Sequence, residues 1–374
     1  MKMRVHLLTE YRSPNSLALN YPFLVHRPFF NKEGIKFYFY ENLSDKIYGC
    51  DVIFINSKFF KSWHAKREEA LFGVLASFKK KIQKVIWFDT NDSTGTTQFN
   101  VMPFVDGYYK NQVLKDASLY TKPFYGHRIF TDYYNRTFKV FDEESAKAPT
   151  QSHSVSVLLQ PQYAHKLHVS WNSAMNEWGR SSHFFGHNYF YEELVARIRT
   201  HLPFKTDYTV QFIKVEKNRK IDVNGRIGLS HSRNTIRYQR QMIANILREK
   251  FNVDTNKVSR RRYLVELSNS KIGISPFGWG EINYRDFEII INGALLIKSD
   301  MSHLETWPPL YVENETYISY SWGLEDFEEK LRDILRNKEK IIAISKKAQE
   351  LYAYYLYGNG RFEFCNKVLN IIHR

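Results

Sequence analysis

Short apolar runs alternate with longer segments of mixed polar and apolar residues along the first 145 residues. This pattern predicts buried strands separated by helices. Short runs rich in β-branched and aromatic residues each end at a polar or turn-forming residue, as buried strands do. These runs are residues 5–8, 35–40, 51–56 and 84–88. Residues 66–82 carry Leu71, Leu75 and Phe78 at helical spacing. Such alternation is typical of an open parallel α/β sheet.

A polar segment at residues 142–154 interrupts this pattern with little apolar surface to bury, and we interpret it as a linker or surface loop. After it, the pattern predicts an amphipathic helix at residues 188–201 and a strand at residues 208–215. The expected units are a first domain at residues 1–150, a second at 151–350, and a terminal helix at 351–374 that packs back toward the first domain.

The alternation then resumes and predicts a second α/β unit. The expected strands are residues 226–230, 271–275, 294–298 and 317–320. The expected helices are residues 237–250, 262–268 and 284–292, with one or two closing helices within 324–347.

The composition supports two packed cores. Of 374 residues, 43% are hydrophobic and 16% are aromatic, which supplies ample apolar surface. Only Cys50 and Cys365 are present, far apart, so we expect no disulfide framework and a reducing compartment. No run approaches the roughly 20 apolar residues of a membrane span, and residues 5–8 are too short for a signal-peptide core. We therefore expect a cytoplasmic protein, soluble or peripheral on the inner face of the membrane.

The chain carries a net charge of +15, which suits an anionic partner: nucleic acid, a membrane surface or a phosphorylated substrate. The excess of Lys and Arg over Asp and Glu is concentrated in one part of the chain. Residues 197–262 hold 17 Lys and Arg against 5 Asp and Glu, whereas residues 281–350 hold 9 against 14. Because ligands of open α/β sheets bind at the carboxyl ends of the strands, a positive field in the second unit favours a phosphorylated ligand.

The segment from residue 270 to 300 carries the most informative chemistry. A buried strand ends in a turn that contains Gly278 and Gly280, where backbone amides can approach a ligand closely. Arg285 and Glu288 are three residues apart, so they project from one side of the helix that follows. This arrangement could bind a diphosphate and a sugar hydroxyl, although an ordinary surface ion pair explains the same spacing.

The run G-W-G-x-x-x-Y-R-D-F-E-x-x-x-x-G-A-L-L-I resembles the C-terminal donor-binding half of GT-B fold glycosyltransferases, especially glycosyl transferases group 1 and exostosin-like members. The likeness covers about residues 270–335, under a fifth of the chain. It implies two Rossmann-like α/β domains facing a cleft, a nucleotide-diphosphate sugar held mainly by the second domain, an acceptor held by the first, and no metal or other cofactor. By matched position, Glu288 corresponds to a carboxylate that binds the ribose and Arg285 to a cation near the phosphates.

One position departs from the pattern of that family. Many retaining members carry a second glutamate where this sequence has Gly280, and the nearest carboxylate is Glu281. The resemblance therefore leaves open whether transfer retains or inverts the anomeric configuration.

The expected donor site comes from two segments, residues 231–237 and residues 278–288. The segment S-H-S-R-N-T-I-R-Y-Q-R at residues 230–240 offers His231, Ser232, Arg233 and Arg237 at a strand-to-helix junction. We expect Arg233 to clamp phosphate oxygens first, although a solvated helix face fits equally well. The full expected donor set is His231, Ser232, Arg233, Arg237, Gly278, Trp279, Gly280, Glu281, Asn283, Tyr284, Arg285 and Glu288.

An acceptor base is expected from the first domain. Asp89 and Asp92 follow the strand at residues 84–88, with His127 behind them, and a carboxylate there could accept the proton of an acceptor hydroxyl. An Asx-turn or a helix cap is the competing explanation for either aspartate. His165, His168, His183 and His187 match no strong zinc spacing, so we expect no metal site.

These observations predict a glycosyltransferase that acts on a glycan acceptor, with bacterial surface polysaccharide assembly, such as O-antigen, lipopolysaccharide or capsule, as the setting. The alternative is a non-catalytic GT-B-like protein or a nucleic-acid-binding basic protein. A lipid-linked acceptor would also favour peripheral contact with an anionic membrane. Candidate contacts are Phe59, Phe60, Lys61, Trp63, Lys66 and Lys79 to Lys81.

Overall fold

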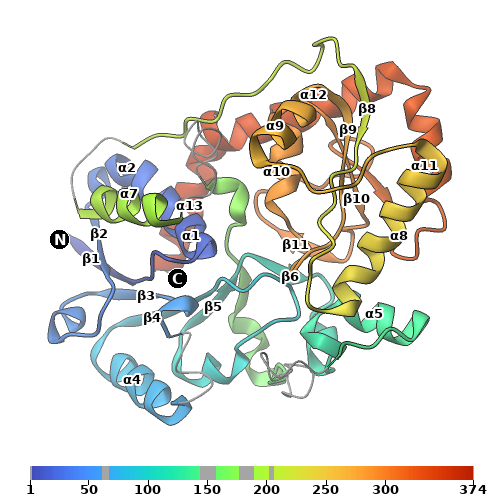
Figure 1. Ribbon diagram of the computed structural model, residues 1–374. Helices are drawn as coiled ribbons and strands as arrows, with labels where there is room; N and C mark the ends of the chain where they lie inside the picture. Colours follow the sequence, from blue (N-terminus) through green and yellow to red (C-terminus); the bar gives the residue numbers. More distant parts are fainter. Residues whose placement is uncertain (1, 61–66, 144–156, 177–188, 202–205, 374) are drawn as a thin grey trace.

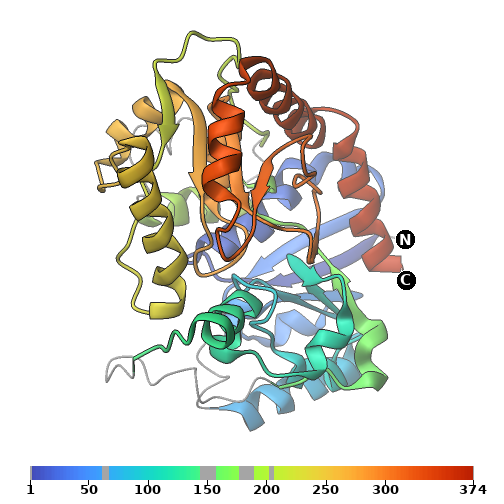
Figure 2. The ribbon, with the colours of Figure 1, turned by 90° about the vertical axis from the view of Figure 1, so that its right-hand side faces the viewer.

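The structure is a computed structural model that describes residues 2–60, 67–143, 157–176, 189–201 and 206–373. It contains two parallel sheets, each flanked by helices, and a short antiparallel pair of strands between them (Figure 1). We call residues up to 201 the first half and residues from 206 onward the second half. Figure 2 shows the second half resting on the first. The prediction of two parallel α/β units is confirmed.

The first half is built on a six-stranded sheet in the order β2-β1-β3-β4-β5-β7, in which every pairing is parallel. Its central strand is entirely buried and apolar up to its last residue, as a strand covered on both faces must be. The strands are β1 (Met3–Leu8), β2 (Ile35–Tyr40), β3 (Val52–Asn56), β4 (Lys84–Asp89), β5 (Gly107–Lys110) and β7 (Leu167–Val169).

Helices cover this sheet and short 3-10 turns connect its elements. The helices are α1 (Pro14–Val25), α2 (Arg27–Lys32), α4 (Glu68–Lys81), α5 (Ile129–Phe138) and α7 (Tyr189–His201). The 3-10 turns are η1 (Asp45–Tyr48), η2 (Ser57–Phe60), η3 (Phe99–Phe104), η4 (Ala117–Thr121), η5 (Tyr125–His127), η6 (Pro161–Lys166) and η7 (Ser173–Met175).

The second half is built on a four-stranded parallel sheet in the order β12-β10-β9-β8. Its strands are β8 (Ile221–Asn224), β9 (Ser270–Ser275), β10 (Leu295–Ser299) and β12 (Ile318–Tyr320). Its helices are α8 (Asn234–Phe251), α9 (Arg260–Ser268), α10 (Tyr284–Ile291), α11 (Phe327–Leu335), α12 (Lys338–Tyr357) and α13 (Gly360–His373). The strands and helices expected between residues 260 and 300 are all present.

Two expected strands of this half do not form. Residues 226–230 are irregular, and the edge strand is β8, which ends just before Gly225. Residues 208–215 are also irregular, because side chains of α12 satisfy their carbonyls: Tyr357 donates to Val210 at 2.8 Å and Gln349 donates to Ile213 at 2.9 Å. The alternating burial of this segment thus comes from packing on a helix.

The first sheet extends past residue 150, where we expected the domain boundary. Strand β7 pairs with β5, with Tyr109 opposite His168, and α7 lies against α1 and β2. The expected linker at residues 142–154 falls almost entirely outside the described residues. Chain beyond residue 150 therefore still contributes to the first half.

The terminal helix α13 crosses back to the first half (Figure 2). Phe364 is 0% exposed, and its ring centroid lies 5.0 Å from that of Trp171 and 6.1 Å from that of Phe23. Lys84 of β4 donates to the carbonyl of Ile372 at 3.2 Å. Aromatic packing thus anchors the end of the chain on the first half.

Strands and a buried carboxylate join the two halves. Strand β6 (Gln112–Leu114) pairs antiparallel with β11 (Leu304–Thr306). Glu281, at 0% exposure, accepts from the Thr94 amide at 3.1 Å, from the Thr94 hydroxyl at 2.6 Å and from Gln112 Nε2 at 3.3 Å. Beside it, Gly280 lies so close to the first half that a Cβ would overlap the Asp92 carbonyl oxygen.

We predict that Phe364→Ala lowers stability by about 3–5 kcal/mol, because it removes a fully buried ring and leaves a cavity between α13 and the first half. Phe362→Ala is the matched control: that ring is 58% exposed, so its removal should change stability by less than about 0.5 kcal/mol. Urea unfolding followed by tryptophan fluorescence measures both. Equal midpoints for the two variants would contradict the packing of α13.

We predict that Gly280→Ala destabilises the protein by about 1–3 kcal/mol and loosens the contact between the halves, because the added methyl group meets a backbone carbonyl that cannot rotate away. Gly73→Ala on α4 is the control. A methyl group added there would have no atom within 4 Å, so alanine should stabilise the helix by about 0.5–1 kcal/mol. Thermal unfolding and limited proteolysis report the two effects, and an unchanged protease pattern for Gly280→Ala would count against a tight contact.

Candidate active site

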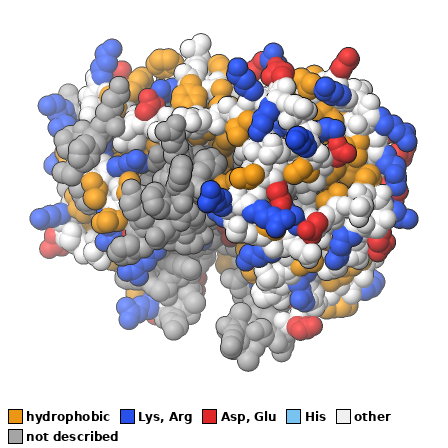
Figure 3. All heavy atoms as spheres, turned by 45° about the horizontal axis from the view of Figure 1, so that its top comes forward, with side chains coloured by type: hydrophobic (Ala, Val, Ile, Leu, Met, Phe, Trp, Pro, Cys, Tyr) orange, Lys and Arg blue, Asp and Glu red, His pale blue; other side chains and the backbone are white. Residues whose placement is uncertain are grey.

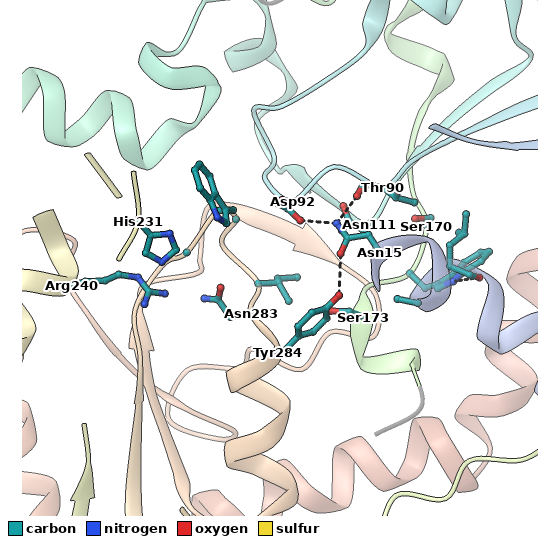
Figure 4. A pocket seen from close by; sticks show the side chains of 17 residues that line it. Asn15, Thr90, Asp92, Asn111, Ser170, Ser173, His231, Arg240, Asn283 and Tyr284 are labelled. Carbon is teal, nitrogen blue, oxygen red and sulfur yellow. Dashed lines mark hydrogen bonds between the residues drawn. The ribbon is translucent and has the colours of Figure 1, made fainter. Parts of the chain in front are cut away.

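A cavity of about 220 Å³ lies between the two halves, at the carboxyl ends of strands from both sheets (Figure 4). The first half contributes Asn15, Ala18, Leu19, Thr90, Asp92, Asn111, Ser170, Trp171 and Ser173. The second half contributes His231, Arg240, Gly278, Trp279, Gly280, Ile282, Asn283 and Tyr284.

The wall from the second half is formed by the turn at residues 276–283, which we call the glycine turn. It follows β9 and leads into α10, where Asn283 and Asp286 form a capping box. A Cβ at Gly278 would lie 2.5 Å from Asn283 Oδ1, so only glycine fits beside the cap. The N-terminal end of α10 therefore borders the cavity, and the amides of a helix N-terminus favour anions.

Arg240 is the cation of this wall, and the sequence analysis missed it. Its Nε donates to the Phe277 carbonyl at 2.7 Å and its Nη1 to the Gly228 carbonyl at 2.9 Å, so the guanidinium is held in place. Within the part of the chain that the structure describes, no partner is recorded for Nη2. Burial, with a smaller effect of Arg285, lowers the pKa of Arg240 to about 9, so the group stays charged at neutral pH.

His231 stands beside Arg240 in the lining, and its ring packs edge-on against Trp279 at 5.6 Å between centroids. Burial, and next the charge of Arg240, lowers the pKa of His231 to about 4. The imidazole is therefore neutral at pH 7 and can offer one hydrogen bond but no charge.

The other residues of the predicted cationic loop lie outside the lining. Arg233 precedes α8 and donates to the Gly126 carbonyl of the first half at 3.0 Å. Arg237 is exposed and donates to Asn234, and Ser232 is exposed. The expectation that Arg233 clamps a phosphate is thus not matched by its position; Arg240, seven residues along the helix, faces the cavity.

Arg285 and Glu288 share a side of α10, as their spacing predicts, but that side faces α9. Glu288 pairs with Arg260 at 2.8 Å, and the Arg285 guanidinium lies 5.0 Å from the centroid of the Tyr263 ring. Neither residue lines the cavity. Glu281 is also absent from the lining, because it is buried between the halves.

The candidate bases have different surroundings. Asp89 is fully buried, pairs with Lys110 at 3.0 Å and accepts from the Tyr108 hydroxyl at 2.5 Å. These contacts stabilise the fold and keep Asp89 away from the cavity. Asp92 lines the cavity, with a largely exposed side chain. His127 is not in the lining, and its carbonyl accepts from the Thr96 hydroxyl at 3.2 Å. Of the three, the structure brings only Asp92 to the site.

The polar lining of the first half follows the ends of its strands. Thr90 follows β4, Asn111 follows β5 and Ser170 follows β7. Sequence reasoning missed Asn111 and Ser170 because it did not predict these two short strands, whose carboxyl ends would have pointed to them. Among the described residues of this wall, Asp92 is the one charged side chain.

Neither a metal cluster nor a membrane-spanning helix is present among the described residues. No group of three or more His, Cys, Asp or Glu side chains is arranged to hold a metal ion. No helix in the described ranges is both long and apolar enough to cross a membrane. Among the candidate membrane contacts, Phe60 is fully buried and Phe59 half-buried, while Lys61, Trp63 and Lys66 lie outside the described residues.

No family model and no curated protein sequence matches the chain. Solved structures that resemble it along their full length include two described as glycosyltransferases and the protein HepE. An α-glucosyltransferase in complex with UDP and a DNA 13-mer has a TM-score of 0.45 at 10% identity, with 100% of both chains covered. HepE from Anabaena in complex with UDP has a TM-score of 0.44 at 7% identity, covering 98% of this chain and 99% of that one. A glycosyltransferase from Rickettsia africae has a TM-score of 0.42 at 11% identity, covering 99% and 98%.

Proposed function

We propose that this protein is a GT-B-type glycosyltransferase that moves a sugar from a nucleotide-diphosphate donor to a glycan acceptor. The observation that carries the proposal is the cavity between two parallel α/β units, with a buried, fixed guanidinium on one wall and an exposed carboxylate on the other. An inverting transfer uses both: a cation where the departing diphosphate gains charge, and a base where the acceptor hydroxyl loses its proton.

Arg240 and the N-terminal end of α10 form the donor side in this proposal. Breaking the bond between the anomeric carbon and the diphosphate oxygen leaves negative charge on the nucleotide. Arg240 is already oriented by two backbone carbonyls, so it can stabilise that charge with little reorganisation. Neutral His231 would add a hydrogen bond. In this scheme the donor is the co-substrate, and neither a metal nor another cofactor is required.

Asp92 is the base in this proposal. It accepts the proton of the acceptor hydroxyl as the new bond to the anomeric carbon forms. Asp89 is unsuited to this role because Lys110 and Tyr108 both donate to its Oδ2 and the Asn91 amide donates to its Oδ1. The hydroxyl and amide groups around Asp92 suit a polyhydroxylated acceptor, since they can both donate and accept hydrogen bonds.

A glycan acceptor fits the site better than a nucleic acid. Among the residues that the structure describes on the acceptor wall, Asp92 is charged and the others are neutral, and a carboxylate suits a hydroxyl donor better than a phosphate. On the face shown in Figure 3, Lys and Arg side chains are spread out and mixed with Asp and Glu. We place the reaction in bacterial surface polysaccharide synthesis, in the cytoplasm or at the inner membrane face; the family resemblance of residues 270–335 and the basic charge support this setting.

The experiment that tests this function is a screen of nucleotide sugars with mass-spectrometric detection of the released nucleotide. Purified protein is incubated with UDP-, GDP-, TDP- and CMP-sugars, each with and without a panel of oligosaccharides and single-stranded oligonucleotides. Acceptor-dependent release of UDP, GDP or TDP supports the proposal. Release of CMP alone would contradict the diphosphate donor, and modification of oligonucleotides alone would contradict the glycan acceptor.

We predict that Arg240→Gln weakens binding of the released nucleoside diphosphate about 10- to 100-fold, because it removes charge-assisted hydrogen bonds to the phosphates. Arg237→Gln, on the exposed face of the same helix, is the matched control and should bind as the wild type does. Isothermal titration calorimetry measures both affinities, and circular dichroism confirms that each variant is folded. A larger loss in Arg237→Gln than in Arg240→Gln would restore the loop arginines as the phosphate site.

A further inference from the structure

Asn15, at the start of α1, joins the two walls of the cavity (Figure 4). Its Nδ2 donates to Asp92 Oδ1 at 2.6 Å and to the Thr90 carbonyl at 2.9 Å. Its Oδ1 accepts from the Tyr284 hydroxyl of the second half at 3.1 Å. One carboxamide thus connects the candidate base to the first residue of α10.

These contacts fix the orientation of the carboxamide. Both N–H groups of Nδ2 are used, and both point to acceptors of the first half. The oxygen faces a donor from the second half. Rotating the amide by 180° would set its N–H groups against the tyrosine and its oxygen against a carboxylate and a carbonyl, so only the observed orientation satisfies all three partners.

The same contacts leave one oxygen of Asp92 for the acceptor. Asn15 binds Oδ1, and among the described residues no partner is recorded for Oδ2. The backbone carbonyl of Asp92 is also held, because Gln112 donates to it. The carboxylate is therefore anchored through one oxygen and through its main chain, while the second oxygen remains accessible from the cavity.

We propose that Asn15 is a positioning residue that orients Asp92 as the base and, through Tyr284, ties this orientation to the approach of the donor wall. This inference rests on the proposed function. Tyr284 is the first residue of the helix whose N-terminal end borders the donor side, so separation of the halves would break its bond to Asn15 and leave the carboxamide oxygen without this partner. With the walls together, three hydrogen bonds rather than two fix the carboxamide that orients the base.

Physical chemistry sets the sign of the effect. A hydrogen bond donated to a carboxylate stabilises its ionised form, so losing the Asn15 donor favours protonation and inactivates the base at a higher pH. Other charged or titratable groups around the Asp92 loop stay unchanged in Asn15 variants. They are Lys58 and Lys110 next to Asn91, Arg128 on the side of α5, Glu281 beside Gln112, and His231, Arg240 and Tyr284 from the second half.

The test compares Asn15→Ala, Asn15→Asp and Tyr284→Phe with the wild type in steady-state kinetics from pH 4.5 to 8.5. We expect Asn15→Ala to lower kcat about 10- to 100-fold, to leave the donor KM within about twofold, and to move the acid limb of the kcat profile to higher pH. Asn15→Asp should move the limb further, because it places a like charge beside Asp92. Tyr284→Phe should move it least, since it frees the carboxamide without removing the donor.

Asn370→Ala, an exposed position on α13, is the control and should change neither kcat nor the limb. A fall in kcat with an unmoved acid limb in all three cavity variants would overturn the inference, because it would indicate a merely structural role. An acid limb that moves as far in Asn370→Ala as in the cavity variants would also overturn the inference.

A second readout separates this inference from the proposed function. Carbon-13 NMR of labelled aspartate carboxyls, with the Asp92 signal assigned from Asp92→Asn, follows titration without any turnover. If the wild type transfers no sugar, the proposed function fails, and a titration midpoint that moves to higher pH in Asn15→Ala still supports orientation of Asp92 by Asn15. An unchanged midpoint overturns the inference even when the wild type is active.

Discussion

The contact between the glycine turn and the loop after β4 sets the geometry on which the cavity depends. At its centre the Glu281 carboxylate is buried between the halves and receives its recorded hydrogen bonds from neutral donors, Thr94 and Gln112. A carboxylate deprived of water is costly unless its oxygens are bonded, so Glu281 can stay buried between the halves only while Thr94 and Gln112 donate to it. Gly280 completes the contact by allowing the turn to touch the Asp92 carbonyl.

This contact also explains why the two walls differ in charge. The turn that reaches across carries the N-terminal end of α10, and Arg240 lies behind it, held by the Phe277 and Gly228 carbonyls. The loop that receives it carries Asp92. Cation and carboxylate therefore belong to opposite walls, with neutral amides and hydroxyls between them. Among the described residues that line the cavity, Arg240 is the cation, so the proposed donor side relies on a buried guanidinium rather than on a broad basic surface.

Much of the fold could be predicted from the sequence, because it follows from local patterns. Buried runs such as residues 51–56 and 271–275 have no alternative to a central strand, and the apolar spacing of residues 66–82 specifies a helix. Short elements were harder. Strand β5 is four residues long and tyrosine-rich, and β7 has three residues, too few to establish a period. Residues 208–215 alternate like a strand but pack on α12, and only tertiary contacts distinguish the two cases.

The candidate site could be predicted only in part, for a related reason. The glycine turn was recognisable because its residues are contiguous. Arg240 shares a buried helix face with Ile236, Ile243 and Leu247, and this spacing is present in the sequence. The prediction instead named Arg233 and Arg237, which lie nearer the start of the helix. Asn15, Asp92 and Tyr284 are separated by up to 269 positions. The bond from Asn15 to Asp92 joins two distant segments of the first half, and the bond from Tyr284 to Asn15 forms only when both halves are assembled. A site built from such contacts cannot be read from a motif confined to one half.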